Sequence, residues 1–340
     1  MTRQAMRRRF LRDQGLEDAE VVALDPDASA RRYFRLSGQG LLLMDAPPPG
    51  EHPAAFIAVT GFLARLGARV PRIHAADAQQ GFVLLEDLGD GTFTRLLADG
   101  APEEELYGLA MDELICLQTR CGADMAGIDL PPYDESAALK EAALFTEWYL
   151  PARLGQALKA SEHGEYLDVW SGLFHALPPL APVLVHRDFH VDNLLLVGQR
   201  CAMIDYQDAL LGSPVYDVVS LVEDARRDVD PAMRARLVER WRDCLDIPPE
   251  TYGRQAAFWG AQRHCKVAGI FVRLWLRDGK GIYLQHLGRV VALLGQLLAT
   301  EEFLAPLRDW IAPRMAPVAH RDFAESAEAL RRRCGVHAAR

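Results

Sequence analysis

The chain of 340 residues has few of the cysteines that would build a disulfide or metal scaffold. Its six cysteines include no C-x-x-C pair and no even spacing, which argues against a zinc knuckle and a disulfide framework. Isolated cysteines in apolar segments are typical of reduced thiols in a cytosolic protein, so we expect a cytoplasmic location. The basic start of the chain runs into Asp13 and Glu17 without an apolar stretch, and no signal peptide is predicted.

Long apolar runs and an excess of positive charge are also missing. No run approaches the roughly eighteen apolar residues that span a bilayer, so we expect no membrane partner. The formal net charge of −9 argues against nucleic acid as the main partner. Half of the residues are hydrophobic and 25% are charged, an ordinary balance for a globular protein with a sizeable core. No oligomeric state is predicted.

The glycine-rich signatures that bind phosphate are absent. No G-x-x-x-x-G-K-[ST] occurs, which excludes the P-loop nucleotide hydrolases. Gly89 and Gly91 begin a G-x-G, but Thr94 stands where the third glycine would be, and a solvated turn is the better interpretation. Residues 27–34 lie between two predicted strands, where a nucleotide-covering loop would lie, yet they contain no glycine.

Hydrophobic periodicity predicts an α+β chain with two lobes. We expect a strand-rich N-terminal lobe over residues 1–87 and a larger, mostly helical lobe over 88–340. The first lobe begins with a helix to about residue 20, followed by strands at 21–24, 33–36 and 41–44, a helix at 52–66 and a strand at 81–85. The second has helices at about 102–120, 136–159, 163–176, 214–226, 231–244, 252–277 and 282–299, and short strands between 182 and 205.

One motif carries the chemistry. His186 and Asp188 are followed by Asn193 in an H-x-D-x-x-x-x-N spacing, and Asp205 ends the next short apolar run. Phosphoryl transfer needs a carboxylate that accepts a hydroxyl proton and hard oxygen ligands for Mg²⁺. We therefore predict Asp188 as the catalytic base and Asn193 with Asp205 as the Mg²⁺ ligands. Asp and Asn are also common turn residues, but the strand, turn and strand around them favour a site over coincidence.

Around these residues the sequence resembles the aminoglycoside phosphotransferase family. The similar segments are 186–193, 204–209 and 212–217, and the resemblance spans most of the chain. It implies a bilobal, protein-kinase-like fold and an ATP-dependent small-molecule kinase. His186 and Asp217 are then expected to be structural supports. For Asp208, a supporting role and a metal contact both stay open.

Three further segments narrow the resemblance. Residues 30–36, 43–48 and 262–271 are similar to the anomeric amino-sugar kinases of cell-wall recycling. That similarity implies phosphorylation of the anomeric hydroxyl of N-acetylmuramate and N-acetylglucosamine. Two alternatives remain: a phosphotransferase for aminoglycosides or other small alcohols, and a kinase-shaped binding protein without activity.

The nucleotide side departs from the kinase pattern. Met44 stands about where such kinases carry a phosphate-pairing lysine. Either another cation (Arg31, Arg32 or Arg35) substitutes, or metal alone neutralises the phosphates.

The resemblance also implies contacts with the nucleotide. Ser29 and the backbone around it would approach the phosphates, with Arg31 or Arg32 supplying charge, although a solvated hairpin arginine is equally expected. Main-chain groups of Glu86 and Leu88 would bond the adenine edge.

The acceptor side offers one candidate segment. Arg263 and Lys266 interrupt an otherwise apolar stretch. A polar face of an amphipathic helix explains them. The functional alternative is that one of these cations meets the lactyl carboxylate of N-acetylmuramate through a charge-assisted hydrogen bond.

Overall fold

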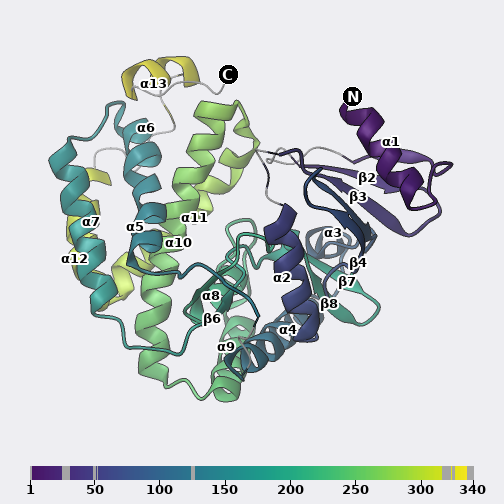
Figure 1. Cartoon of the computed structure of the whole chain (residues 1–340). Helices are drawn as coiled ribbons and strands as arrows, with labels where there is room; N and C mark the ends of the chain where they lie inside the picture. Colours follow the sequence, from purple (N-terminus) through teal and green to yellow (C-terminus); the bar gives the residue numbers. More distant parts are fainter. Residues whose placement is uncertain are drawn as a thin grey trace. The chain divides into compact units, whose positions relative to one another are not determined.

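The computed structural model describes residues 2–24, 31–48, 51, 53–123, 127–315, 323 and 326–334. Contacts between residues divide the chain into two units (Figure 1). Unit 1 comprises Met1–Leu130 and His186–Leu210, and unit 2 comprises Pro131–Val185 and Leu211–Arg340. The predicted α+β class is confirmed, because unit 1 contains a sheet and unit 2 is mainly helical. The lobe boundary at residue 87 stays a prediction, since the units follow contacts rather than chain order.

Unit 1 is built on a five-stranded antiparallel sheet. Its spatial order is β1 (Val21–Ala23), β2 (Arg32–Leu36), β3 (Leu41–Asp45), β5 (Phe82–Glu86) and β4 (Ile73–Asp77). The turn between β2 and β3 contains Gly38 and Gly40, whose φ angles of 71° and 64° lie in the left-handed region that glycine enters without strain. Tyr33 of β2 is thereby aligned with Met44 of β3.

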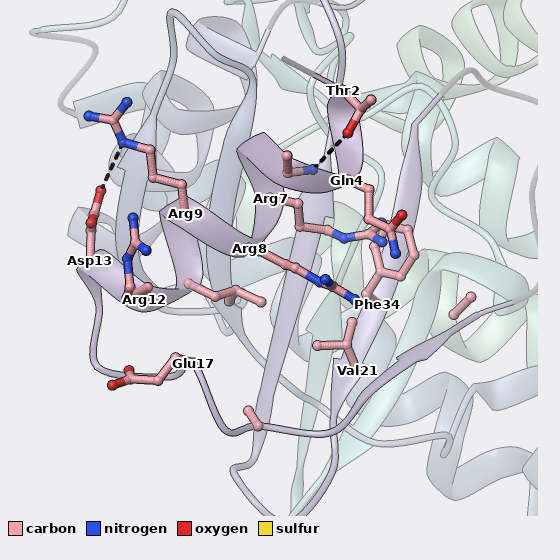
Figure 2. Close-up of a pocket in the computed structure, with 14 residues that line it drawn as sticks. Thr2, Gln4, Arg7, Arg8, Arg9, Arg12, Asp13, Glu17, Val21 and Phe34 are labelled. Carbon is pink, nitrogen blue, oxygen red and sulfur yellow. Dashed lines mark hydrogen bonds and ion pairs between the residues drawn. The ribbon is translucent and has the colours of Figure 1, made fainter.

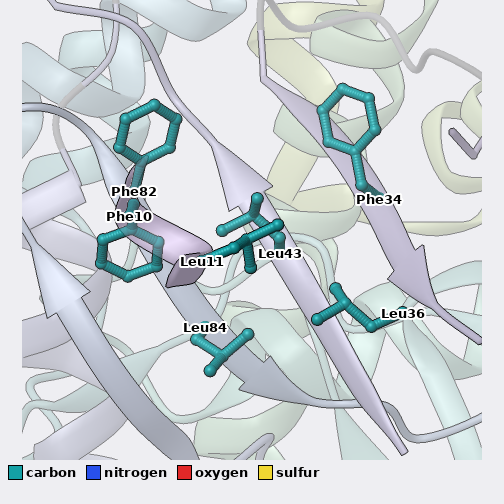
Figure 3. Close-up of a cluster of buried hydrophobic side chains, with 7 residues drawn as sticks. All are labelled: Phe10, Leu11, Phe34, Leu36, Leu43, Phe82 and Leu84. Atoms are coloured by element: carbon teal, nitrogen blue, oxygen red, sulfur yellow. The ribbon is translucent and has the colours of Figure 1, made fainter. Parts of the chain in front are cut away.

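Helix α1 (Arg3–Asp13) covers one face of this sheet. Phe10 and Leu11 pack against alternate residues of the strands, and the whole cluster is Phe10, Leu11, Phe34, Leu36, Leu43, Phe82 and Leu84 (Figure 3). The expected helix to residue 20 is therefore too long. It ends early because Gly15 turns the chain with a φ of 71° and its N–H donates to the carbonyl of Arg12 (2.9 Å).

The rest of unit 1 consists of helices and one hairpin. These elements are α2 (Pro53–Arg65), α3 (Phe93–Ala98), α4 (Glu103–Ala123), the 3₁₀ turn η2 (Val191–Asn193), β7 (Leu194–Val197) and β8 (Arg200–Met203). Helix α3, which the sequence did not predict, starts at Thr92, whose side chain accepts a hydrogen bond from the N–H of Arg95. It lies against the β7–β8 hairpin through a bridge between Thr92 and Leu195.

Unit 2 is organised around the long helix α10 (Pro249–Asp278). Its other elements are α5 (Glu135–Leu144), the π-helix η1 (Phe145–Tyr149), α6 (Leu150–Leu154), α7 (Ala160–His175), β6 (Val183–Val185), α8 (Val215–Val222), α9 (Pro231–Leu245), η3 (Gly281–His286), α11 (Leu287–Thr300), η4 (Glu302–Leu304), α12 (Ala305–Met315) and α13 (Ala327–Cys334). Strand β9 (Leu210–Gly212), which begins at the last residue of unit 1, pairs with β6.

Gly269 sets how closely α10 approaches the end of α5. A Cβ at this position would lie 2.3 Å from the carbonyl oxygen of Leu144, so only glycine fits. The sequence predicted one helix at 136–159 here. The structure has three consecutive pieces, α5, η1 and α6, and ends them at Gly155, where φ is 70°.

Hydropathy singles out the segment Gly281–Thr300. Among the described residues it alone has the length and composition of a membrane-spanning helix, with a mean hydropathy of 1.2 over the best window. The expectation that no run approaches the length of a membrane span is thus corrected for this segment. The segment has an amphipathic pattern, since Leu287, Val290, Leu294 and Leu298 recur at helical spacing and are buried. An amphipathic helix that packs on a protein core can have the same length and composition.

Candidate active site

The β7–β8 hairpin brings the predicted catalytic and metal residues together. Its register pairs Leu194 with Met203, which places Asn193 and Asp205 at the open end. The N–H of Ile204 donates to the carbonyl of Asn193 (3.0 Å). The amide nitrogen Nδ2 of Asn193 in turn donates to the main-chain oxygen of Asp188 (2.9 Å). These two hydrogen bonds connect Ile204, the residue that precedes Asp205, to Asn193, and Asn193 to Asp188.

Two non-glycine residues of this region have left-handed backbones. The φ angle is 75° at Arg187 and 65° at Asp205. Such conformations cost about 1–3 kcal/mol each and persist where the surroundings impose them. At Arg187 the guanidinium contributes, because Nη1 donates to the carbonyl of Asp208 (3.0 Å). At Asp205, Oδ1 accepts from Nε2 of Gln207 (3.0 Å). Specific contacts therefore hold the side chains at both left-handed positions.

Tyr206 anchors the exit of the hairpin to α2. Its ring stacks on Phe56 at 5.5 Å between centroids, and its hydroxyl is 2.9 Å from Oγ1 of Thr60. Burial raises the pKa of Tyr206, so its hydroxyl stays neutral at physiological pH. The ring of His186 lies edge-on to Tyr206 and to Phe189 and is 1% exposed, which is compatible with the expected supporting role.

A cavity of about 450 Å³ opens at this end of the hairpin, within unit 1. Leu42, Leu85 and Leu195 supply apolar surface from two different sheets, and Asn193 and Asp205 supply oxygen atoms. Mostly apolar walls with a few converging polar groups are the usual form of a small-molecule site. The cavity can therefore hold a flat apolar ring with a polar, anionic extension near the two oxygen donors.

The donor set suits a hard divalent cation. Because Asn193 uses Nδ2 to bond Asp188, its oxygen Oδ1 is the atom left to coordinate a metal. Among the described residues, no three His, Cys, Asp or Glu side chains form a metal-binding cluster. Mg²⁺ needs none, since it commonly takes one or two protein oxygens and completes its octahedron with phosphate and water.

Glu86 and Leu88 lie at the cavity wall, as a nucleotide-edge contact requires. The N–H of Glu86 already donates to the carbonyl of Arg72 (2.8 Å), so the carbonyl of Glu86 is the group that can meet a ligand. Its side chain is held elsewhere. Arg69 Nη2 lies 2.6 Å from Oε1, and this hydrogen bond lowers the pKa of Glu86.

The arginines proposed for the phosphates lie in different places. Nη2 of Arg31 is 3.4 Å from Oδ1 of Asp205, and its Nε is 3.3 Å from Oε2 of Glu51. Burial lowers the pKa of Arg31, but nearby anionic groups, including Asp205 and Glu51, raise it overall. Arg32 is exposed, and Met44 is fully buried. Ser29 lies outside the described residues.

In unit 2, the acceptor candidates lie inside a buried polar cluster. Lys266 is 5% exposed, and its Nζ lies 2.9 Å from Oε1 of Glu141. Tyr133 and Gln262 also donate to Glu141, and Arg263 is 2% exposed beside the ring of Tyr216. Asp217 is completely buried near the start of α8. Lys266 therefore already has a carboxylate partner, whereas contact with an acceptor stays a prediction for both cations.

A family model for phosphotransferase enzymes matches residues 20–258. That match covers the sheet, the hairpin and most of the intervening helices. The chain belongs to the phosphotransferase enzyme family. The predicted family resemblance and the predicted enzyme class are therefore confirmed.

Relatives of this phosphotransferase match over nearly their whole length. A protein of Pseudomonas aeruginosa named N-acetylmuramate/N-acetylglucosamine kinase is 40% identical over 307 residues, covering 86% of this chain and 88% of that protein. A Caulobacter vibrioides protein of the same name is 32% identical, covering 93% of this chain and 97% of that protein.

Solved structures show the same fold. A choline/ethanolamine kinase family protein from Mesorhizobium loti aligns with a TM-score of 0.62 at 16% identity, covering 92% of this phosphotransferase and all of that chain. At this identity the likeness concerns the fold alone. It confirms the kinase-like arrangement of a sheet-containing and a helical part.

Some residues of the site were not predicted from the sequence. Tyr33 of the cavity wall and Glu51, the partner of Arg31, were not singled out. Strand alternation could have found Tyr33, since it shares a face of β2 with Arg35, which also lines the cavity. No local signal marks Glu51, because its partner is distant in sequence.

Cavity size alone would have pointed elsewhere. A hollow of about 1270 Å³ lies along α1, lined by Arg7, Arg8, Arg9 and Arg12 with the edge of β1 (Figure 2). Arg7 stacks on Phe34 at 3.8 Å, and Arg9 is 3.9 Å from Asp13. None of the catalytic or metal candidates lines this hollow. The smaller cavity at the hairpin is therefore the one that fits the chemistry of a phosphotransferase.

Proposed function

We propose that this phosphotransferase transfers the γ-phosphoryl group of ATP to the anomeric hydroxyl of N-acetylmuramate and N-acetylglucosamine, in the recycling of cell-wall sugars. The similarity to kinases so named, over 86–93% of this chain, carries the proposal. The acceptor comes from that similarity, whereas the reaction type is supported by Asp188, Asn193 and Asp205 in one hydrogen-bonded arrangement. A cytoplasmic location is part of the proposal, because ATP is available there.

In this proposal Asp188 orients the sugar hydroxyl and accepts its proton. The carboxylate is half-buried, and the side chain of Asn193 fixes its main chain. A carboxylate is a weak base, so it acts by aiming the oxygen at the phosphorus and taking the proton late in a loose transition state. The bond from the sugar oxygen to the γ-phosphorus forms as the bond from phosphorus to the bridging oxygen of ATP breaks, and ADP leaves.

Asn193, through its Oδ1, and Asp205, through its carboxylate, would hold Mg²⁺. When bound, Mg²⁺ would neutralise the charge that develops on the phosphate oxygens. The carbonyl of Glu86 and the N–H of Leu88 would bond the adenine edge, with the register partners Leu42 and Leu85 against one face of the ring. Asp208, whose main-chain carbonyl accepts from Arg187, is assigned a supporting role.

An ATP-depletion assay tests the proposal. The purified protein is incubated with ATP and, in separate reactions, N-acetylmuramate, N-acetylglucosamine, choline and a panel of aminoglycosides, with and without Mg²⁺. We expect turnover with the two amino sugars only, lost when Mg²⁺ is chelated and restored by adding it back. The product should resist borohydride reduction, because phosphorylation of the anomeric hydroxyl removes the reducing end.

Other results would reassign the protein. Turnover with choline or an aminoglycoside but neither sugar would favour the alternative small-alcohol kinase. ATP binding without turnover on any acceptor would favour the non-catalytic interpretation.

A further inference from the structure

The nucleotide site has an unusual feature in β3. The strand that faces the cavity with Leu42 presents Met44 two residues later on the same face, because side chains alternate along a strand. Protein kinases place there a lysine that a helix glutamate holds in position. Met44 is fully buried, and its sulfur lies 3.5 Å from the hydroxyl of Tyr33, its register partner. A buried thioether supplies no charge to a phosphate.

The neighbouring strand offers a cation on the same face. Tyr33 and Arg35 of β2 line the cavity, and Arg31 directly precedes the strand, two residues before Tyr33. Its guanidinium lies 3.4 Å from Asp205, the proposed Mg²⁺ ligand. Arg31 therefore projects toward the end of the cavity where a metal-bound phosphate chain would lie.

The other two candidate arginines are directed elsewhere. Arg32 is aligned with Asp45 on the opposite face of the sheet, and Asp45 pairs with Arg3 of α1. Arg35 bonds Asp87 at 2.6 Å and Asp90 at 2.8 Å, which occupies its donors. Of the three arginines, Arg31 is the one directed at the metal end.

Glu51 gives Arg31 a fixed orientation. Oε2 of Glu51 is 3.3 Å from Nε of Arg31, and Glu51 lies two residues before the start of α2. The side chains of Arg31 and Glu51 are 12% and 17% exposed, so water screens this ion pair only in part. Nε of Arg31 lies beside Glu51 and Nη2 lies beside Asp205, so Nη1 is the nitrogen that we expect to donate to a phosphate oxygen.

We propose that the Arg31–Glu51 pair replaces the strand lysine and its glutamate, with Arg31 binding the β- or γ-phosphate of the nucleoside triphosphate. The inference rests on the proposed function for its donor, and it names the group that discriminates a triphosphate from a monophosphate. Arginine suits this role because its planar guanidinium can give two donors to one phosphate.

Calorimetry with the full chain tests the inference. Affinities for AMP and for a nonhydrolysable ATP analogue with Mg²⁺ are measured for the wild type and Arg31→Ala. We expect Arg31→Ala to weaken binding of the ATP analogue by about tenfold or more, the usual loss for a charge-assisted hydrogen bond, and to leave AMP binding within about twofold. Glu51→Gln should produce a smaller loss in the same direction.

The matched control is Arg32→Ala, which removes the adjacent arginine from the opposite face and should change neither affinity. Met44→Lys supplies the missing lysine. In the wild-type background it should not raise kcat appreciably, because Arg31 already fills the role. In the Arg31→Ala background it should restore part of the affinity for the ATP analogue.

Several outcomes would overturn the inference. They are an unchanged affinity of Arg31→Ala for the ATP analogue, an equal loss for AMP and the analogue, or a tenfold gain in kcat from Met44→Lys alone. Failure of the proposed function looks different: the wild type would then phosphorylate neither amino sugar, while the ratio of the two nucleotide affinities would still report on Arg31. Melting temperatures of all variants separate misfolding from lost contact.

Discussion

The hairpin of unit 1 and helix α10 of unit 2 both carry polar side chains that the sequence marks as functional, and they hold them in different ways. At the hairpin, Asp188, Asn193 and Asp205 are half-buried, and main-chain hydrogen bonds fix their positions. On α10, Lys266 is buried and neutralised by the carboxylate of Glu141. At the hairpin, Asn193 and Asp205 line a cavity where a ligand can reach them (the open arrangement), whereas on α10 the polar side chains satisfy one another (the closed arrangement).

This difference separates two reasons for placing a charge in a protein. A buried charge needs a partner, because removing it from water costs several kcal/mol. Lys266 with Glu141, and His264 with Glu223 at 2.9 Å, meet that need within unit 2. A catalytic charge needs a fixed position and an open side. Exposure and the type of partner therefore distinguish the two roles better than residue type does.

The largest expected effect comes from Asp188→Asn, which tests the open arrangement. We expect kcat to fall about 10²–10⁴-fold, the usual contribution of a positioned base, while nucleotide affinity stays within a few-fold. Steady-state kinetics and calorimetry on the same preparation measure both. Asp192→Asn is the matched control, since Asp192 lies in the same loop and bonds Thr94. Residual activity above about one percent would remove Asp188 from the role of base.

The closed arrangement is tested by Lys266→Met. Loss of Lys266 leaves the carboxylate of Glu141 buried without its cation, so we expect stability to drop by about 3 kcal/mol. The double variant Lys266→Met/Glu141→Gln should recover part of that loss. Urea unfolding of Lys266→Met, Glu141→Gln and the double variant gives the coupling free energy between the two side chains. A raised KM for N-acetylmuramate with unchanged stability would contradict this and would support the acceptor contact instead.

The smallest effect concerns a half-buried pair, Glu86 with Arg69. Because the hydrogen bond from Arg69 lowers the pKa of Glu86, the pair stabilises the fold above the unfolded-state pKa and loses that effect as pH falls through the folded-state value. We expect Glu86→Gln to lower the free energy of unfolding by at most about 1 kcal/mol at neutral pH, and by less at an acidic pH below the unfolded-state pKa. An equal difference at both pH values would show that the loss does not come from the ion pair.

The sequence was sufficient to predict the structure where the functional residues lie in short segments with local signals. The H-x-D-x-x-x-x-N motif and the following acidic residue predict the hairpin, since its apolar runs and glycine turn are local signals. Strands β2, β3 and β5 were predicted for the same reason. The family then followed from the same residues.

Other features depend on contacts that no local pattern records. Strand β4 was missed because four of the five residues of Ile73–Asp77 are small or polar, and it becomes a strand by pairing with β5. The break of the expected 136–159 helix into α5, η1 and α6 lies where Gly269 of α10 approaches Leu144. The choice between Arg31, which directly precedes β2, and Arg32, within β2, likewise needed the contacts of Arg31 and the register of Arg32.

The left-handed backbones at Arg187 and Asp205 have a consequence for engineering and evolution of this protein. A glycine at either position would relieve the backbone and remove a side chain with a defined contact. Selection for heat resistance alone would therefore favour changes that weaken turnover. Thermostable variants that remain active should carry their substitutions away from this hairpin. Arg187 and Asp205 are the positions at which a stabilising substitution is expected to cost activity.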